Sequence, residues 1–332
     1  MTKFNDFGND LYTGKRSIDF VGRRRIWFSI AIVMVLAALI IPFVRGGFVF
    51  GIEFRGGSEF TIENPQTLPD GTIDQNLAID AVQSVSPSSV PRVSIVNNGA
   101  SVRVQTDTVS TEESAAIRDA LGAAYNSDSV NVSLIGATWG QDITRQALTA
   151  LIVFIVLAAI VMALYFRTWK MSLAAMVALL HDLIITAGFY GILGFEVTPA
   201  AVIGFLTILG YSLYDTVVVF DKIRENTSEA SSRTFGESVN LAVNQTLVRS
   251  INTSVVALLP IGSILFIGAF VLGAGTLRDI SLALFIGVLV GTYSTIFIAA
   301  PLYAALRQND AVIVQADKKK PSTLARTTGA VR

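Results

Sequence analysis

Three ionisable side chains interrupt stretches of the sequence that are otherwise almost entirely apolar. Asp215 lies within the apolar segment 199–220, and His181 and Asp182 are neighbours within the apolar segment 171–194. A carboxylate at the centre of a bilayer costs roughly 2.5–3.5 kcal/mol on insertion scales, so such groups usually face a protein interior and mark ion or proton pathways. A carboxyl group in a low-dielectric environment can bind and release a proton. The chemistry that these residues predict is therefore proton transfer.

Each of these groups also has a purely structural interpretation. A static ion pair would explain Asp215, and a hydrogen bond to a neighbouring helix would explain His181 and Asp182. Tyr211 and Ser212 precede Asp215 by four and three residues, so they can hydrogen-bond its carboxyl group from the same helix face. We expect a transport role for Asp215 and leave both interpretations open for His181 and Asp182.

A basic partner for Asp215 is available on the next apolar segment. Arg249 is the nearest in chain order, and Thr246 and Thr253 lie on the same stripe of its helix. The charges that follow Asp215, from Asp221 to Glu225, among them Arg224, have a different interpretation. They mark the end of the helix, where it leaves the bilayer and is anchored at the interface.

The composition indicates lipid as the solvent of much of the chain. Hydrophobic residues make up 52% of the 332 residues and charged residues only 15%, whereas soluble proteins average about 25% charged. A helix needs ~20 apolar residues to cross a bilayer. Six stretches have this character: 26–44, 147–166, 171–194, 199–220, 250–270 and 280–303. The first is longer than a signal-peptide core and lacks a cleavage site after it, so we interpret it as a retained anchor.

Lysine and arginine gather on one side of these six predicted spans. They lie in the N-terminal segment 1–25, in the turn 167–170, in the loop 221–249 and in the tail 304–332. Cytoplasmic loops carry this excess of positive charge, so both ends of the chain are predicted to be cytoplasmic. We expect the tail to be disordered and the region 146–303 to form a bundle of five spans.

Residues 45–145 differ from the rest because they are acidic and polar, with six Arg, no Lys and twelve Asp or Glu. Alternating and helical patterns predict the order strand, helix, strand, strand, helix, strand, with an Asn-Gly turn as a hairpin signal. The segments are 58–63, 73–85, 91–96, 101–106, 111–125 and 129–135. This βαββαβ order predicts a ferredoxin-like α+β domain outside the cytoplasm.

Two weaker patterns concern helix packing. In segment 233–249 the apolar residues recur at helical spacing, which favours an amphipathic helix along the inner membrane surface, with an ordinary connector as the alternative. Gly287 and Gly291, and Gly204 and Gly210, are typical of helices that pack closely in lipid.

The residue counts also exclude some functions. The chain has no cysteine and one histidine, so disulfides, thiolate chemistry and multi-histidine metal sites are excluded. We expect neither a metal nor another cofactor. We also expect no nucleic-acid partner, although the formal net charge of zero does not bear on that question.

Several motifs resemble the SecF family, the smaller half of the SecD–SecF protein-export pair, and span nearly the whole chain. The segments are RSIDFVGRRRIWF, FGIEFRGG, GYSLYDTVVVFDKIREN, TLVRSINTS and IGVLVGTYSTIFIA. The resemblance implies kinship with resistance-nodulation-division transporters and six helices with one large extracytoplasmic domain after the first. It also implies a multi-pass protein of a prokaryotic plasma membrane.

The resemblance further implies partners and roles. The family works with SecD, the SecYEG channel and, indirectly, the SecA motor, and uses the proton gradient to move translocating polypeptides outward. It implies that Asp215 is the proton-relay carboxylate, with Arg249 as its basic partner and Thr253 in the same site. Gly56 and Gly57 close the FGIEFRGG turn. Glu53 stands in this motif where many relatives have Asp.

Three alternatives remain at this point. The first is half of a proton-coupled exporter of small molecules or lipids. The second is an intramembrane protease or lipid hydrolase that uses Asp182 and Asp215, and the third is a structural scaffold. Our preferred hypothesis is proton-coupled work without covalent chemistry. Protonation of Asp215 would release Arg249, shift the fourth and fifth spans, and move the domain at 45–145 through the first and second spans.

Overall fold

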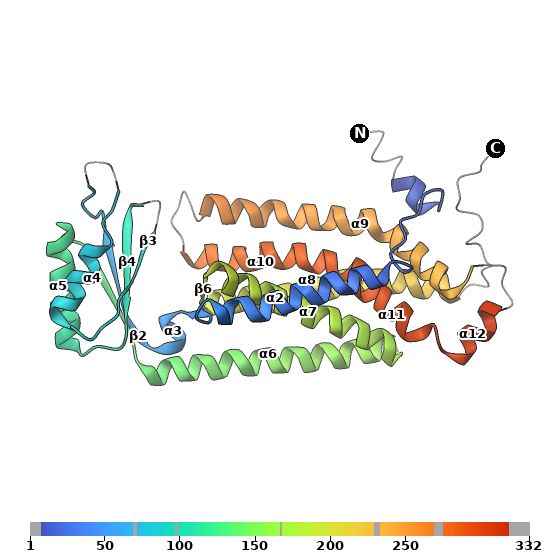
Figure 1. Cartoon of the computed structure of the whole chain (residues 1–332), viewed down its shortest axis with the longest axis horizontal. Coiled ribbons are helices and arrows are strands. Elements are labelled where there is room, and N and C mark those ends of the chain that lie inside the picture. Colours follow the sequence, from blue (N-terminus) through green and yellow to red (C-terminus); the bar gives the residue numbers. More distant parts are fainter. Residues whose placement is uncertain are drawn as a thin grey trace.

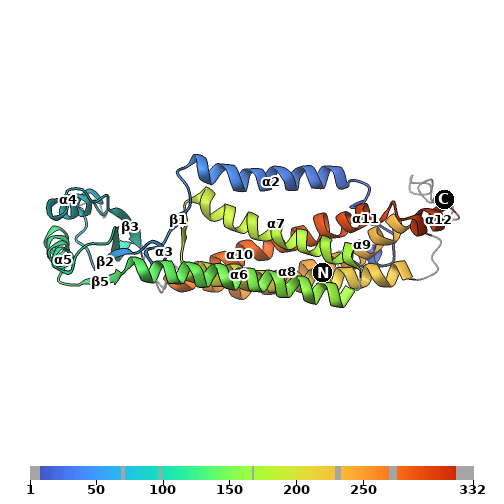
Figure 2. The same ribbon diagram turned by 90° about the horizontal axis from the view of Figure 1, so that it is seen from below.

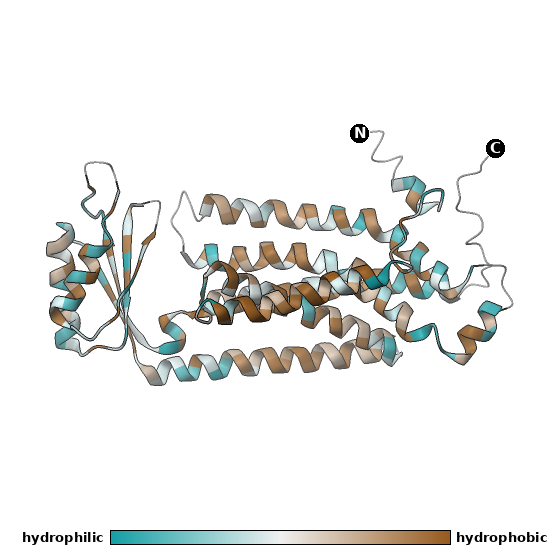
Figure 3. Cartoon of the chain, viewed as in Figure 1, coloured by the Kyte–Doolittle hydropathy of each residue, from teal (hydrophilic) through white to brown (hydrophobic). Residues whose placement is uncertain are grey.

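The structure is a long helix bundle with a small α/β domain at one end (Figure 1). It is a computed structural model, which describes residues 8–68, 72–96, 99–166, 168–228, 233–268 and 275–318. Hydrophobic residues dominate the bundle helices, whereas hydrophilic residues gather in the α/β domain and at the opposite end of the bundle (Figure 3). This distribution is that of a protein whose middle part is surrounded by lipid.

Six helical segments of the described residues are long and apolar enough to cross a membrane, which confirms the six apolar spans predicted from the sequence. The uninterrupted ones are α2 (Arg24–Val44), α6 (Ala137–Phe166), α7 (Trp169–Leu193) and α8 (Pro199–Ser228). The fifth is α9 (Phe235–Ser263) with the π-helical turn η2 (Ile264–Gly268). The sixth is α10 (Gly275–Ser294), the π-helical turn η3 (Thr295–Ala299) and α11 (Ala300–Arg307).

The six segments differ in how deeply they are buried. The segments α7, α8 and α10 to α11 are the most buried, whereas α2, α6 and α9 expose most of their apolar surface. Figure 2 shows α2 and α6 on opposite sides of this central group. The exposed apolar faces of the outer helices are therefore available to lipid or to helices of other chains.

Two of the predicted glycine positions let the central helices approach closely. A Cβ atom on Gly204 of α8 would lie 2.6 Å from the Cβ of Ala283 in α10, and a Cβ on Gly287 would collide with Ile208. The close packing predicted for these glycines is confirmed. The same prediction is wrong for Gly210, because nothing lies within 4 Å of the position of its Cβ.

The α/β domain contains four strands and two helices in the order predicted from the sequence. The elements are β2 (Gly57–Glu63), α4 (Asn76–Val85), β3 (Arg92–Val96), β4 (Ser101–Thr106), α5 (Thr111–Tyr125) and β5 (Val130–Ile135). The strand order in the sheet is β3-β4-β2-β5, and every neighbouring pair is antiparallel. The helices α4 and α5 cover the face of the sheet that is turned away from the bundle (Figure 1).

The core of this domain lies between the sheet and its two helices. Phe60, Val102, Ile117 and Leu121 are fully buried there. Helix α5 begins at Thr111 because Ser110 and Glu113 form a capping box, in which the Ser110 hydroxyl accepts a hydrogen bond from the Glu113 amide. Amphipathic spacing and this cap explain why the predicted range of α5, 111–125, is correct.

A short connection that the sequence did not predict joins the domain to the bundle. Strand β1 (Val49–Phe50) pairs in parallel with β6 (Glu196–Val197), which lies between α7 and α8. Helix α3 (Ile52–Arg55) follows β1, and then Gly56 and Gly57 take φ angles of 75° and 146°. Those angles strain any residue with a Cβ atom, so the two glycines are required to turn the chain from α3 into β2.

The amphipathic surface helix predicted for 233–249 is a wrong prediction. These residues form the first half of the continuous helix α9, and their apolar face packs against the N-terminal segment and α11 instead of a membrane surface. The side-chain amides of Asn240 and Asn244 also accept hydrogen bonds from the backbone N–H groups of Phe20 and Ile18, both at 2.8 Å. The helical spacing was recognised, but the surface that covers it was not.

Helix boundaries also differ from the prediction where polar residues continue a helix beyond the apolar part. Helix α6 begins at Ala137, so the α/β domain ends at β5 rather than at residue 145. In the tail, helix α12 (Ala311–Lys318) stands where disorder was predicted. Residues 319–332 lie outside the described part of the chain.

Candidate functional site

Asp215 lies inside the bundle, on the side of α8 that faces α9. Its side chain is buried, and its Oδ1 accepts a hydrogen bond of 2.9 Å from the hydroxyl of Ser250, which is completely buried on α9. The Oδ2 atom is also buried, and no described residue donates a hydrogen bond to it. Oδ2 is therefore the atom of this carboxyl group that is free to hold a proton.

Arg249 does not contact Asp215 directly in this structure. Its side chain is exposed, and no ion pair joins the two residues in the described part of the chain. Thr253 donates its hydroxyl to the Arg249 carbonyl oxygen at 2.8 Å, within the same helix. The direct partner of Asp215 is thus Ser250, the residue that follows the predicted one.

The hydrogen bond predicted from Ser212 to Asp215 is wrong. The Ser212 hydroxyl donates instead to Oδ2 of Asp182 on α7. Residues three positions apart on a helix differ by about 60° in direction, so Ser212 faces α7 while Asp215 faces α9. The Tyr211 hydroxyl is buried near Ser254 and does not bond Asp215.

The pair His181–Asp182 forms a second buried polar group. Nδ1 of His181 lies 3.2 Å from Oδ1 of Asp182, and both side chains are buried. Since Ser212 bonds the other carboxylate oxygen, Asp182 contacts the helix that carries Asp215. The two carboxyl groups bond different partners, however, so they do not form the facing pair that aspartyl catalysis requires.

Hydroxyl groups that the sequence analysis did not single out connect the helices around these carboxyl groups. Thr216 of α8 lies 3.0 Å from Thr295, the first residue of the π-helical turn η3. Ser254 of α9 is hydrogen-bonded to Thr292 of α10. Hydroxyl side chains within apolar spans are the signal that could have found them, and π-helical turns often mark functional positions.

The charged residues beyond Asp215 lie towards the C-terminal end of α8. Tyr165 at the end of α6 donates its hydroxyl to Asp221 at 2.7 Å, and Lys222 pairs with Glu225 at 2.7 Å. Arg224 is exposed. These contacts are separate from the buried group at Asp215.

A third polar cluster joins the sheet to β6. The Gln105 side chain donates to Glu59 at 3.0 Å and to Glu196 at 2.8 Å, and Arg103 lies 3.5 Å and 3.8 Å from the same two carboxylates. Burial raises the pKa of Glu53 in α3, and the charges of Glu196 and Glu59 act in the same direction. Of this cluster, the motif FGIEFRGG marks only Glu53, because the other members come from separate elements.

These features define a class of protein. The six apolar helices and the charge-poor bundle describe a polytopic α-helical membrane protein, and the buried Asp215, Asp182 and His181 place ionisable groups inside that bundle. A single α/β domain at one end is attached through β1, α3 and α6.

Comparisons with known proteins identify the family within this class. A family model described as "Protein export membrane protein SecD/SecF, C-terminal" matches residues 116–309. The protein translocase subunit SecF of Mycobacterium tuberculosis (strain CDC 1551 / Oshkosh) is 41% identical over 323 residues, which cover 93% of this chain and 71% of that protein. SecF of Streptomyces coelicolor is 43% identical and is covered to 82% of its length, again with 93% of this chain. The chain therefore belongs to the SecD/SecF family of protein export membrane proteins.

The fold is similar to part of a solved structure. The crystal structure of SecDF, a translocon-associated membrane protein from Thermus thermophilus, matches 89% of this chain with a TM-score of 0.75 and 28% identity. A structure of SecDF in a super-membrane-facing form matches with a TM-score of 0.63 and 29% identity. This chain spans 39% of the first SecDF chain and 40% of the second.

Proposed function

We propose that this protein is an accessory subunit of Sec-dependent protein export that uses the proton-motive force. With a separate SecD-type partner, it promotes the outward movement of polypeptides that pass through the SecYEG channel, and it meets the SecA motor only indirectly. The family membership supports the export role. The observation that carries the proton coupling is the buried carboxyl group of Asp215 with its free Oδ2. No covalent step on the polypeptide is part of this proposal.

The proposed orientation places the α/β domain outside a prokaryotic plasma membrane. The end of the bundle opposite this domain carries α12 and the basic start of α2 (Figure 1). The C-terminal ends of α8 and α11 lie on this same side when the spans are counted in chain order. These ends carry Lys222, Arg224 and Arg307. Because positive residues collect on the cytoplasmic side, both chain ends are assigned to the cytoplasm. Arg167, part of the same argument, lies outside the described residues.

The proposed relay has Asp215 as its proton carrier and Arg249 as its electrostatic partner. When Asp215 binds a proton, its negative charge disappears, and with it the charge-assisted part of the bond from Ser250 and the attraction to Arg249. The contact between α8 and α9 then weakens, so the two helices can shift. Tyr211, Ser212 and Thr253 belong to the surroundings of this site, and His181 and Asp182 form a secondary polar group beside it.

The proposed route from the relay to the domain follows α8. This helix begins directly after β6, where Glu196 accepts a hydrogen bond from Gln105 of the domain. Strand β6 also pairs with β1, which leads into α3 and β2. A shift of α8 therefore reaches the sheet through one hydrogen-bonded connection, in addition to the covalent connections through α2 and α6.

We further propose that the domain is ferredoxin-like and that it is the part that acts on the polypeptide. Its βαββαβ order and its antiparallel sheet order β3-β4-β2-β5 support the first point. Its position at one end of the bundle supports the second, because a domain there lies outside the spans and can reach a polypeptide on that side of the membrane.

Asp215→Asn tests the proposed function, with Asp221→Asn as the matched control at the helix end. Membrane vesicles that contain the variant, its SecD partner and the channel are assayed for export with and without a proton gradient. Asp215→Asn should remove the gradient-dependent part of export and the associated proton flux while the protein still inserts and binds SecD. Asp221→Asn should retain both. Normal gradient-dependent export by Asp215→Asn would refute the proposal.

A further inference from the structure

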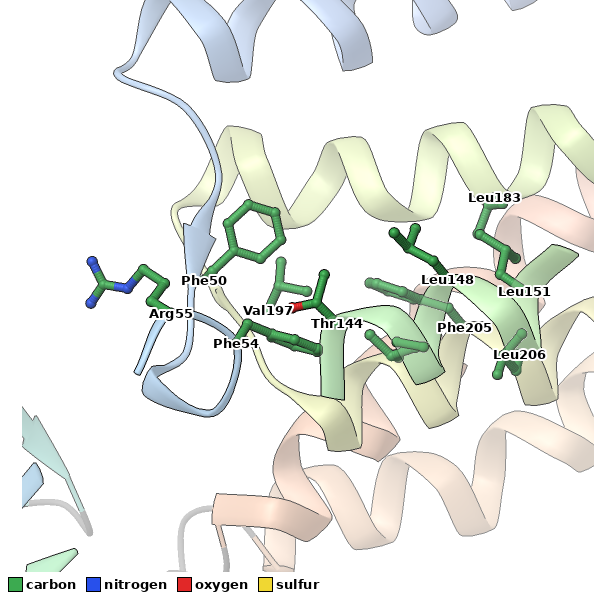
Figure 4. Close-up of a pocket in the computed structure, with 12 residues that line it drawn as sticks. Phe50, Phe54, Arg55, Thr144, Leu148, Leu151, Leu183, Val197, Phe205 and Leu206 are labelled. Carbon is green, nitrogen blue, oxygen red and sulfur yellow. The ribbon is translucent and has the colours of Figure 1, made fainter. Parts of the chain in front are cut away.

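An apolar pocket of about 300 Å³ lies between α6 and α8, at the end of the bundle that carries the α/β domain. Ala147, Leu148 and Leu151 of α6 form one side, and Phe205 and Leu206 of α8 form the other. Phe50, Phe54 and Arg55, from β1 and α3, stand at its outer end (Figure 4). The pocket is separate from the buried carboxyl groups described above.

The interior of the pocket offers no hydrogen bond to a ligand. Thr144 is the only uncharged polar residue that lines it, and its hydroxyl already donates to the Gly140 carbonyl oxygen at 2.8 Å. Burying a polar ligand group there would leave that group unsatisfied, at a cost of several kcal/mol in the worst case. The ligand that fits is therefore apolar along its length.

The position of the pocket gives its ligand access from the lipid phase. Both α6 and α8 are membrane-spanning segments, and Leu148 on the pocket side of α6 is 55% exposed. The lining residues of α6 extend from Thr144 to Leu151, which is ~10 Å along a helix. The pocket thus suits an extended chain that lies along the helices, as lipid tails do.

Arg55 supplies the one charged group of the lining. It is exposed, and no ion pair or side-chain hydrogen bond is recorded for it among the described residues. Figure 4 shows its guanidinium group directed away from the apolar side chains. A guanidinium group binds phosphate through two parallel hydrogen bonds, so an anionic group at the outer end of the ligand would be complementary to it.

We propose that this pocket binds one anionic phospholipid, with an acyl chain between α6 and α8 and the phosphate on Arg55. The site lies beside the connection to the α/β domain, because Gly140 of α6 packs so closely on α3 that a Cβ atom there would lie 2.7 Å from the Phe54 carbonyl oxygen. The bound lipid fills the space between α6 and α8 at this end of the bundle. It thereby stabilises the position of α3 against α6. This inference does not depend on the proposed proton relay.

Native mass spectrometry of the full chain tests the site with phosphatidylglycerol and phosphatidylcholine as probes. The unchanged protein should retain one phosphatidylglycerol more tightly than one phosphatidylcholine. Ala147→Phe fills the pocket and should retain neither, whereas Ala150→Phe, on the exposed side of α6, should behave as the unchanged protein. Arg55→Gln should lose about tenfold in affinity for phosphatidylglycerol, the equivalent of one hydrogen bond to a charged group, while Arg145→Gln should not.

Equal lipid retention by Ala147→Phe and Ala150→Phe would overturn the proposal, as would equal retention of the two lipids by the unchanged protein. Photo-crosslinking in cell membranes provides a test that does not depend on a folded Phe variant. A photoreactive amino acid at position 148 should form adducts mainly with anionic phospholipid. The same group at the lipid-facing position 157 should form adducts with less preference for anionic phospholipid. An adduct to another protein chain at position 148 would show that a helix fills the pocket and would refute the lipid assignment.

Discussion

Gln105 and Arg103 are the two side chains of the α/β domain that contact Glu196 of β6, and removal of Gln105 should loosen that contact measurably. Its amide group donates two hydrogen bonds, at 3.0 Å to Glu59 in the sheet and at 2.8 Å to Glu196 at the start of the bundle. Gln105 is itself 5% exposed. Gln105→Ala removes the only amide donor that links these two carboxylates in the described structure.

The magnitude follows from the charge and exposure of the acceptors. A hydrogen bond to a charged group contributes about 1.5–3 kcal/mol, and the side chain of Glu196 is 17% exposed, so the lower end of that range applies. The bond between Gln105 and Glu196 should therefore contribute about 1.5 kcal/mol. That energy corresponds to about a tenfold larger opening constant when the bond is removed.

Hydrogen exchange measures this opening at the backbone of the connection. The Gly51 amide donates to the Val197 carbonyl oxygen at 3.0 Å, so its protection reports whether β1 and β6 stay paired. Gln105→Ala, Glu196→Ala and the double variant are compared in a double-mutant cycle. Gln83→Ala, on an exposed position of α4, is the control that should leave the exchange unchanged.

The expected result is a coupling of about 1.5 kcal/mol between the two substitutions. Additive effects of Gln105→Ala and Glu196→Ala would show that the domain and the bundle are not connected through this bond. In that case the route from α8 to the sheet through the bond between Gln105 and Glu196 would have to be abandoned.

Two further predictions concern the pH dependence of the connection and the packing of the spans. The folded pKa of Glu53 is raised above its unfolded value by burial, so its contribution to stability is present below the unfolded pKa and is lost as the pH rises through the folded pKa. Hydrogen-exchange protection factors around α3, which are corrected for the pH dependence of intrinsic amide exchange, should therefore be higher at mildly acidic than at neutral pH, and Glu53→Gln should remove this difference. Gly287→Ala places a Cβ atom against Ile208 and should lower the thermal stability in detergent by about 1–3 kcal/mol, whereas Gly210→Ala, which faces open space, should not; equal midpoints for the two variants would contradict the packing described.

The number and order of the membrane spans could be predicted because hydropathy is a property of the local sequence. The strands and helices of the α/β domain were predicted for the same reason, since alternation and helical spacing are local signals. The ends of α6 and α9 were misjudged because polar residues continue both helices beyond their apolar part. The parallel pairing of β1 with β6 joins residues far apart in sequence, so no local pattern could indicate it.

The site shows the same division between residue types and their contacts. We predicted burial for Asp215, His181 and Asp182 because an ionisable side chain within an apolar span is unfavourable in lipid and therefore faces the protein interior. Their partners depend on how each helix is rotated against its neighbours, which only tertiary packing decides. Because of that rotation, Ser212 donates a hydrogen bond to Asp182 and Ser250 donates one to Asp215. Proximity in the sequence had instead suggested Ser212 as a partner of Asp215.

The central claim is that Asp215 carries the proton, and infrared difference spectroscopy of the carboxyl groups tests it most directly. The full chain with its SecD partner is reconstituted in lipid, and spectra are recorded as the external pH is changed. The account predicts a carboxylic-acid band that changes with pH in the unchanged protein and in Asp221→Asn but is missing in Asp215→Asn. The same band, unchanged, in Asp215→Asn would contradict the account.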